Sequence, residues 1–342
     1  MLLLAMFIGL LAGCGNSAQT SGSTSSTGTP LPSVVNIGTQ QIPNGERIAI
    51  EKGIFEAALG VKVNIIEFQA GDIRNALVSK DIDFAHLGSS SATIGIANGI
   101  DVEMIWIHEV LGMAEQLVAK NGSGIETIQD LIGKKVATPF SSTAHYSLLK
   151  ALELNGIPEK DVEIYDMQMP DVYAAWQRGD IDAAYAWEPT LSNLLADGKT
   201  IISSEDLANK GVVTMNVEIV RREFARMYPD IVVKYIKAVD ECVALFKENQ
   251  PEAVKSIAKA MELTEADALK QMTGSIWLRA EEQLAPAYFG TSANRGNLAA
   301  AIKDTADFLY EQNSLVSEPQ LSVFEAAINP YYIEQAVQQN KK

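Results

Sequence analysis

Two loops of this sequence place small hydroxyl side chains where sheets of the α/β type bind their ligands. Gly88 to Ser91 and Pro139 to Tyr146 each follow a short apolar run and lead into a helical pattern. In such sheets, ligands bind beyond the carboxyl ends of the strands, where a helix N-terminus offers free N–H groups and a partial positive charge. Serine hydroxyls there suit a sulfonate, phosphate or carboxylate group. Helix capping by Ser90 or Ser91 is the simpler explanation of the first loop alone, but two such loops favour an anion site.

A third loop of the same kind runs from Ala186 to Pro189, between a predicted strand and a predicted helix. Pro189 suits the first position of that helix. Trp187 could form the wall of a pocket, and Glu188 could bind a cationic group. The alternative for Glu188 is a favourable interaction with the helix dipole alone.

Short β-rich runs alternate with helical segments from Val34 onward, which predicts an α/β fold with largely parallel sheets. Two series of strands are expected: Val34–Thr39, Val61–Phe68, Phe84–Leu87 and Val102–Ile107 in the first, and Gln116–Ala119, Lys135–Thr138, Val162–Tyr165 and Ala183–Ala186 in the second. After Arg221 the pattern is almost entirely helical to Gln338, with amphipathic runs such as Ile231 to Phe246. Cys242 falls within that run and is expected to be a buried thiol rather than a disulfide partner.

The two series share a turn. Asp81-Ile82-Asp83 and Asp180-Ile181-Asp182 each lie between a helix and a strand, so we expect two similar lobes, each with a doubly wound sheet. Residues 34–119 together with 221–342 are assigned to lobe 1, and residues 120–220 to lobe 2. Two chain crossings, at Ala119–Gly124 and Met215–Val220, would form a hinge beneath a cleft, the geometry of closure around a ligand.

The composition is that of a folded protein with an acidic surface. Hydrophobic residues make up 47% of the 342 residues and charged residues 20%, which suffices for two lobes with cores of their own. The formal net charge is -16, and no long basic run is present. Such a surface repels phosphate backbones, so we expect no nucleic acid partner. Any anion site must therefore be built locally.

The first residues predict export. Leu2 to Leu11 form an apolar run of the length of a signal-peptide core, and the run ends in Leu11-Ala12-Gly13-Cys14. This end resembles a bacterial lipobox, so residues 1–14 are predicted to be a lipoprotein signal with Cys14 as the lipidated residue. Residues 15–33 are rich in Ser, Thr and Gly, as a flexible tether to the outer face of the cytoplasmic membrane needs. No Lys or Arg precedes the apolar run, so cleavage elsewhere, which would leave a free periplasmic protein, is the alternative.

Three segments carry a resemblance to a known family. They are Leu87 to Ser90, Pro139 to Leu149 with its Ser-Thr-Ala-His-Tyr-Ser-Leu-Leu run, and Trp176 to Trp187. From about Val34 to its C-terminus, the chain resembles the taurine-binding proteins of bacterial ABC importers, within the wider group that binds aliphatic sulfonates and nitrate. The resemblance implies a periplasmic-binding-protein-like (type II) fold of two lobes. It also implies capture of taurine in the cleft and delivery to a membrane permease and its ATPase, without catalysis and without a cofactor.

The resemblance also implies which residues line the cleft. They are Gln40, Ser89, Ser90, Glu115, Thr143, His145, Tyr146 and Trp187, and we add Ser142 of the second serine loop, Glu188 and Asn216 to the predicted site. Glu115 could face a ligand ammonium group, and a salt bridge at the hinge is its alternative. Two positions depart from the family pattern, because Glu188 stands where a small residue is expected and Asn216 where an Asp is expected. Either a carboxylate has moved between these positions, which would preserve an ammonium site, or the ligand differs.

Two rival classes are left open by the sequence. An enzyme on the same fold is one, but His86, His108 and His145 are scattered, no metal-ligand spacing is present, and neither serine loop has an evident base beside it. A sensor subunit that binds the same anion is the other. Within the binding class, the alternatives to taurine are another alkanesulfonate, an aminophosphonate or a small zwitterion. No metal site is predicted, and the protein is expected to be a monomer.

Overall fold

The computed structural model describes residues 30–69 and 72–340, and residues from Leu31 onward form one compact unit. The predicted signal, the lipidation site Cys14 and the predicted tether up to residue 29 lie outside the described residues. Within the described ranges, no helix is both long and apolar enough to cross a membrane.

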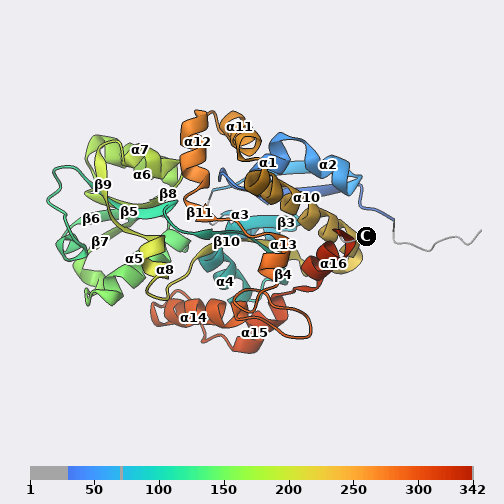
Figure 1. The fold of residues 1–342 in the computed structure, drawn as a ribbon. Helices are drawn as coiled ribbons and strands as arrows, with labels where there is room; N and C mark the ends of the chain where they lie inside the picture. The colour runs from blue at the N-terminus through green and yellow to red at the C-terminus, as the bar shows by residue number, and fades with distance from the viewer. Residues whose placement is uncertain (1–29, 70–71, 341–342) are drawn as a thin grey trace, which may run out of the picture. The chain divides into compact units, whose positions relative to one another are not determined.

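Two β-sheets organise this unit (Figure 1). The first has the order β11-β4-β10-β3-β1-β2, with β1 Val34–Thr39, β2 Lys62–Glu67, β3 Phe84–Gly88, β4 Val102–Leu111, β10 Met215–Arg221 and β11 Ser275–Ile276. The second has the order β7-β6-β8-β5-β9, with β5 Glu115–Lys120, β6 Lys135–Thr138, β7 Glu163–Asp166, β8 Ala183–Trp187 and β9 Gly198–Ser203. The predicted strands are confirmed to within a few residues, whereas β9 and β11 were not predicted.

Each sheet contains one strand that enters it from the other sheet and is antiparallel to both of its neighbours. β10 pairs antiparallel with β3 and β4, and β5 pairs antiparallel with β8 and β9. β1 is parallel to β2 and β3, as β6 is to β7 and β8. β11 also pairs antiparallel with β4. The predicted α/β fold with two similar sheets is therefore confirmed, but the sheets are mixed rather than largely parallel, because four of the strand pairings among the described residues are parallel and five are antiparallel.

The chain passes between the sheets at residues 112–114 and 209–214, because β5 already pairs in the second sheet and β10 already pairs in the first. The sequence placed both crossings one strand too late, at Ala119–Gly124 and Met215–Val220. If each lobe is defined by its sheet, the predicted lobe boundaries after residues 119 and 220 are also one strand too late. The physical reason is that an apolar run identifies a buried strand but not the sheet in which that strand pairs.

The repeated Asp-Ile-Asp turn makes the same contacts in both sheets. Asp83 Oδ2 accepts a hydrogen bond from the Asn36 N–H of β1 at 2.9 Å, and Asp182 Oδ2 accepts one from the Lys135 N–H of β6 at 2.9 Å. Each carboxylate thus links a strand, β1 or β6, to the turn that precedes the parallel strand beside it, β3 or β8. The two lobes fix the register of their central strands in the same way.

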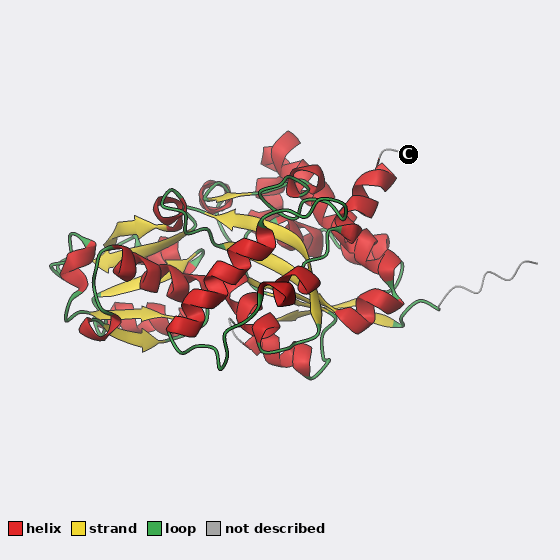
Figure 2. Cartoon of the chain, turned by 90° about the horizontal axis from the view of Figure 1, so that it is seen from below, coloured by secondary structure: helices red, strands yellow, loops and turns green. Residues whose placement is uncertain are grey.

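Helices cover both faces of the sheets (Figure 2). Those before the second crossing are α1 Gly45–Glu51, α2 Ile54–Leu59, α3 Asp72–Val78, α4 Ser89–Ala97, α5 Thr143–Leu154, α6 Met169–Arg178, α7 Thr190–Leu194 and α8 Ser204–Ala208, with short 3-10 helices at Ile128–Leu131 and Glu159–Asp161. Those after it are α9 Arg222–Met227, α10 Pro229–Glu248, α11 Gln250–Ala260, α12 Glu265–Met272, α13 Ala280–Gln283, α14 Leu298–Glu311, α15 Leu321–Ala327 and α16 Tyr331–Asn340.

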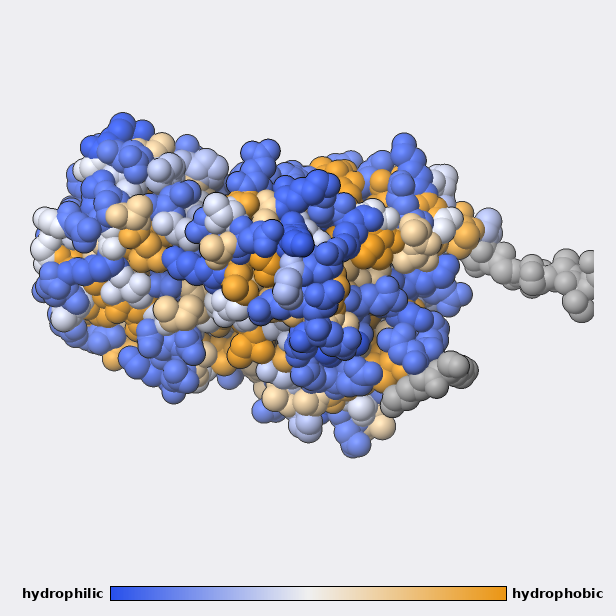
Figure 3. Space-filling model, turned by 45° about the horizontal axis from the view of Figure 1, so that its top comes forward, coloured by the Kyte–Doolittle hydropathy of each residue, from blue (hydrophilic) through white to orange (hydrophobic). Residues whose placement is uncertain are grey.

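The C-terminal helices pack on the first sheet, as predicted. α10 contacts α1, α2, α11 and α16, and the apolar side chains of these helices share one buried cluster with β1, β3 and β4. Cys242 of α10 belongs to that cluster, and burial raises the pKa of its thiol to about 12, which confirms the predicted buried thiol. On the face visible in Figure 3, hydrophilic side chains predominate and the apolar ones form separate patches.

One C-terminal helix also reaches the second lobe. α14 packs against α4 and α15, yet its Phe308 belongs to the apolar cluster around β5 and β8. The Phe308 ring meets the ring of Tyr146 edge to face, with centroids 5.4 Å apart. Lys150 Nζ lies 4.6 Å from the centroid of the same ring. Through Phe308, α14 ties the two lobes together.

Candidate functional site

A cavity that is partly open to solvent lies between the two sheets. Its lining comes from both lobes and consists of Gln40, Ile42, Pro43, Leu87, Gly88, Ser91, Glu109, Leu111, Ala114, Glu115, Ser141, Ser142, Thr143, Trp187, Glu188, Asn216, Gln271 and Ser275. Of the described residues that line it, none is Lys or Arg, whereas Glu109, Glu115 and Glu188 are carboxylic acids. The cavity therefore offers hydroxyls, amides and carboxylates, but no cationic side chain.

The first serine loop connects β3 to α4. Gly88 is the N-cap of α4 and the helix begins at Ser89, so the predicted cap by Ser90 or Ser91 is wrong. Ser91 lines the cavity, whereas Ser89 and Ser90, which were predicted to do so, lie outside the lining. Ser89 Oγ accepts a hydrogen bond from the Met215 N–H at 3.3 Å, and Ser90 is fully buried.

The second serine loop leads into α5. Ser142 is the N-cap of this helix, and its Oγ accepts a hydrogen bond from the His145 N–H at 3.2 Å. Ser142 and Thr143 line the cavity, so the N-terminus of α5 borders it, as the sequence predicted. His145 and Tyr146 lie outside the lining. The His145 ring stacks on Phe140 with centroids 4.3 Å apart, and burial lowers the pKa of His145 to about 4, so its imidazole is neutral at neutral pH.

Two polar atoms of the lining are buried without a hydrogen-bond partner among the described residues. They are Ser91 Oγ and Gln271 Oε1. Gln40, a predicted site residue, also lines the cavity, but its Nε2 donates to the His86 carbonyl at 3.1 Å. Buried polar groups are normally paired, so Ser91 and Gln271 are available to a bound molecule.

The third loop brings Trp187 and Glu188 to the cavity, as predicted. Glu188 Oε1 accepts a hydrogen bond from Ser192 Oγ at 2.9 Å, and Oε2 accepts one from the Ser192 N–H at 3.1 Å. Burial raises the pKa of Glu188, although the contacts with Ser192 oppose the rise. Glu188 therefore both borders the cavity and stabilises the first turn of α7.

Glu115, at the start of β5, lines the cavity and is 1% exposed. Its carboxylate accepts hydrogen bonds from the hydroxyls of Thr143 at 2.5 Å, Ser204 at 2.8 Å and Ser147 at 3.5 Å. Burial nevertheless raises the pKa of Glu115 to about 7. None of the ion pairs among the described residues involves Glu115, so the salt bridge considered as its alternative role is not formed.

One carboxylate of the lining was not predicted. Glu109 of β4 is 2% exposed and lies opposite Asn216 of β10. Its Oε1 accepts a hydrogen bond from Asn216 Nδ2 at 2.6 Å, and its Oε2 accepts one from Asn44 Nδ2 at 3.2 Å. Burial raises the pKa of Glu109, whereas the nearby His86 and the hydrogen bonds from Asn216 and Asn44 lower it. A carboxylate therefore does lie beside position 216, but on the neighbouring strand.

The two lobes touch at the cavity. A Cβ atom on Gly88 would lie 2.9 Å from Thr143 Cγ2 and 3.6 Å from Asn216 Oδ1. Thr143 is held in place because its hydroxyl donates to Glu115. The absence of a side chain at Gly88 therefore allows α5 to approach β3 this closely.

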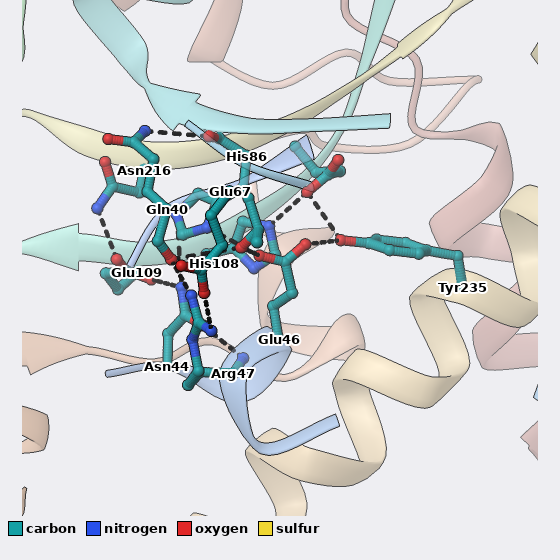
Figure 4. Close-up of polar contacts among 12 residues, drawn as sticks. Gln40, Asn44, Glu46, Arg47, Glu67, His86, His108, Glu109, Asn216 and Tyr235 are labelled. Atoms are coloured by element: carbon teal, nitrogen blue, oxygen red, sulfur yellow. Dashed lines mark hydrogen bonds and ion pairs between the residues drawn. The ribbon is translucent and has the colours of Figure 1, made fainter. Parts of the chain in front are cut away.

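A buried polar network lies behind Glu109 in the first lobe (Figure 4). Glu46, His86 and His108 offer ligand atoms within 4.8 Å of one another, as a metal site would. However, His86 Nδ1 lies 2.9 Å from Glu46 Oε2, and His108 Nε2 lies 2.8 Å from Glu218 Oε2. These are hydrogen-bond lengths, shorter than the separation of about 3.3 Å between ligands around a tetrahedral zinc ion. Shared protons account for this cluster better than a metal ion.

Two α/β sheets joined by two crossings, with a cavity between them, are the fold of the periplasmic-binding-protein type. Residues 33–275 match the model of the family described as the substrate binding domain of the ABC-type glycine betaine transport system, and the chain belongs to this family. It is the substrate-binding protein of an ABC import system rather than an enzyme. Such proteins bind a small molecule and act with a permease and an ATPase.

Two sequence relatives and one solved structure agree with this assignment. The chain is 34% identical over 288 residues to the taurine-binding periplasmic protein of Escherichia coli strain K12, an alignment that covers 82% of this chain and 87% of that protein. It is 30% identical over 332 residues to a putative aliphatic sulfonates-binding protein of Bacillus subtilis strain 168, covering 92% and 96% of the two chains. The alkanesulfonate-binding protein from Xanthomonas axonopodis pv. citri, solved with MOPS bound, has the same fold, with a TM-score of 0.74, 21% identity and coverage of 87% and 99%.

Proposed function

We propose that this protein captures taurine, or a small sulfonate closely similar to it, and delivers it to the permease of its importer. The observation that carries the proposal is the lining of the cavity, which combines helix N-termini and hydroxyls with buried carboxylates and lacks any Lys or Arg among the described residues. The names of the two sequence relatives, one for taurine and one for aliphatic sulfonates, support the same class of ligand.

The sulfonate is assigned to the N-termini of α4 and α5. Both helices begin at the cavity, and Ser91, Ser142 and Thr143 bring hydroxyls or backbone N–H groups to the same place. Free N–H groups and the helix dipole stabilise an anion there without a cationic side chain.

The ammonium group is assigned to the acidic part of the lining. Removing an ion from water costs several kcal/mol, so each charge of the ligand needs hydrogen-bonded partners in the cavity. A simple anion would meet Glu109, Glu115 and Glu188 with no cationic side chain to offset them. A zwitterion brings its own cation, and this favours taurine over nitrate, sulfate or a plain alkanesulfonate.

A second ligand class is favoured by one specific observation. Asn216 occupies the place where an Asp is expected from the family resemblance, and it donates to Glu109 at 2.6 Å. The acidic groups are therefore arranged differently from that pattern, which suits another small zwitterion such as an aminophosphonate. The possible ligands are thereby reduced to molecules that carry both an acidic group and an amine.

We further propose that the protein is exported, anchored to the outer face of the cytoplasmic membrane through a lipid on Cys14, and monomeric. The apolar run before Cys14 and the Ser/Thr/Gly-rich stretch after it support export and anchoring. Mass spectrometry of the membrane fraction tests this directly, because lipidation adds acyl chains to an N-terminal Cys14. A mature protein that starts elsewhere and carries no lipid would contradict the anchor.

The ligand is tested by isothermal titration calorimetry. The protein is unfolded and refolded to remove any solute carried through purification, and is then titrated with taurine, ethanesulfonate, 2-aminoethylphosphonate, nitrate and sulfate. We expect taurine to bind with a dissociation constant of about 1 μM or below, about −8 kcal/mol, and nitrate and sulfate not to bind. Binding of nitrate or sulfate alone, or of none of the five, would contradict the proposed function.

A further inference from the structure

The geometry points to Glu109 as the residue that binds the ligand's ammonium group and so selects aminosulfonates over plain alkanesulfonates, an assignment that rests on the proposed function. Glu109 is one of three carboxylic acids that line the cavity, the others being Glu115 and Glu188. The three differ in how far the protein itself compensates their charge.

Glu115 and Glu188 are compensated within their own lobe. Three hydroxyls, those of Thr143, Ser147 and Ser204, surround the carboxylate of Glu115. Glu188 lies just before α7, and its two oxygens accept hydrogen bonds from the hydroxyl and the N–H of Ser192 in the first turn of that helix. A carboxylate at a helix N-terminus is stabilised by the free N–H groups there.

Glu109 has fewer hydrogen-bond donors than Glu115. Its only hydrogen-bond donors among the described residues are the neutral side-chain amides of Asn44 and Asn216, one on each oxygen. A carboxylate has about four acceptor positions, so both oxygens of Glu109 retain capacity for further donors. Because Glu109 borders the cavity and is almost completely buried, that capacity is open to a bound molecule.

Asn44 lies between Glu109 and His86. Asn44 is the N-cap of α1, and its Oδ1 accepts a hydrogen bond from the Arg47 N–H at 3.0 Å. This fixes the orientation of the Asn44 amide, so its Nδ2 faces both Glu109 Oε2 and His86 Nε2, the latter at 3.4 Å. His86 Nε2 must then be an acceptor, and its one proton lies on Nδ1, toward Glu46.

The rest of the network holds that arrangement in place. Tyr235 Oη contacts Glu46 Oε1 at 2.7 Å and Glu218 Oε2 at 2.8 Å. One hydroxyl proton cannot serve both carboxylates, so one carboxyl must itself be protonated. Burial raises the pKa of Glu218 well above its ordinary value, which assigns the proton to Glu218 and leaves Glu46 as the acceptor for His86. Figure 4 shows Asn44 between this network and Glu109.

A ligand ammonium group would reach Glu109 directly from the cavity, which no cationic side chain of the described lining residues does. An unpaired buried carboxylate is destabilising by several kcal/mol, and a bound ammonium group removes this penalty only when it reaches the carboxylate directly. Ethanesulfonate has the anionic group and the two carbons of taurine but no amine, so it leaves Glu109 unpaired. Selection against it follows from the cost of that unpaired group.

The test is calorimetry with taurine and ethanesulfonate on the wild-type protein, on Glu109→Gln and on Glu103→Gln. Glu103 lies on the same strand β4, is 5% exposed and is paired with Arg222, but it does not line the cavity. We expect Glu109→Gln to weaken taurine binding by about 100-fold and to change ethanesulfonate binding by less than about threefold. Glu103→Gln controls for loss of a buried carboxylate and is expected to change neither affinity.

A rescue variant separates a direct role from a structural one. Asn216 Nδ2 lies 2.6 Å from Glu109 Oε1, so the double variant Glu109→Gln, Asn216→Asp exchanges the amide and the carboxylate across one hydrogen bond. We expect it to regain taurine affinity to within about tenfold of the wild type, because the carboxylate remains in the cavity. A residue that only supported the fold would not show this ligand-specific recovery.

Each outcome decides a different point. Taurine binding by Glu109→Gln at wild-type strength, or an equal loss of both ligands, overturns the role of Glu109 and leaves the proposed function standing. Failure of the wild-type protein to bind either ligand overturns the proposed function, and the assignment of Glu109 with it. If circular dichroism shows that Glu109→Gln is unfolded, the double variant carries the test, and loss of its preference for taurine over ethanesulfonate overturns the assignment.

Discussion

The unusual protonation of Glu115 makes the stability of the ligand-free protein depend on pH in a defined direction. Burial raises the pKa of this carboxyl from 4.5 to about 7 in the folded protein, despite three hydroxyl donors. In the unfolded chain Glu115 titrates near its ordinary value. Between about pH 4.5 and pH 7 the folded state therefore holds a proton that the unfolded state releases, and stability falls as the pH rises through this window.

The size of the effect follows from the two pKa values. One pH unit corresponds to about 1.4 kcal/mol, so a rise from 4.5 to about 7 amounts to about 3 kcal/mol of unfolding free energy. Glu115→Gln removes the titration and keeps the shape of the side chain. We compare the two proteins by subtracting the unfolding free energy of Glu115→Gln from that of the wild type. This difference is expected to be about 3 kcal/mol larger at pH 4.5 than at pH 8, because protonated Glu115 stabilises the wild type only at the lower pH.

The assay is urea unfolding of both proteins at pH 4.5, 6, 7 and 8, followed by circular dichroism after removal of bound solute. Subtracting the variant cancels the other titrating groups, including the carboxyls of Glu109 and Glu188, whose pKa values are also raised by burial. A difference that stays constant within about 1 kcal/mol across this range would refute the reasoning, because Glu115 would then titrate normally.

Three further substitutions test separate parts of the account. Gly88→Ala places a methyl group 2.9 Å from Thr143 Cγ2 and should hinder the approach of the two lobes. Calorimetry should then show taurine binding weakened about tenfold. Unchanged affinity would show that the lobes need not meet at this position. Phe308→Ala removes the ring that packs on Tyr146, and urea unfolding should show a loss of about 3 kcal/mol, whereas a loss below about 1 kcal/mol would mean that α14 does not tie the lobes together. Tyr235→Phe removes the hydroxyl between two buried carboxyls and should destabilise the protein by about 2 kcal/mol in the same assay, with no loss if the network is already satisfied without it.

The alternation of strands and helices could be predicted because each strand is a short apolar run bounded by a turn or a helix. Lys135–Thr138 was predicted with the bounds that the structure shows. The crossings could not be placed correctly, because β5 and β10 pair with strands far away in the sequence, and nothing in their own residues specifies those partners. β11 has only two residues, too few for a periodic pattern.

The sequence predicted correctly which loops border the cavity. It did not predict which residues in the first turns of α5 line the cavity. Thr143 and Ser147 lie one turn apart on α5, and both hydroxyls reach Glu115. His145 and Tyr146 fall on other faces of the same helix, so they contact Phe140 and α14 instead of the cavity. The family resemblance identified this segment as part of the site, but only the helical period determines which of its side chains face the cavity.

Glu109 was missed because it belongs to an apolar strand whose predicted end was Ile107, whereas β4 continues to Leu111. The sequence did contain one signal, because Glu109 follows His108 at the end of a buried strand. A carboxylate is rarely buried without a partner, so this position could have been singled out as a candidate binding residue. Its partners, Asn44 and Asn216, come from distant parts of the chain and could not be assigned from spacing.

The most direct test of the account is a crystal structure of the protein with taurine bound. We predict that taurine lies in the cavity between the two sheets, with its sulfonate at the N-terminus of α5 beside Ser142 and Thr143 and its ammonium nitrogen about 2.8 Å from an oxygen of Glu109. Taurine bound outside this cavity, or bound with its ammonium group away from all three carboxylates, would contradict the account.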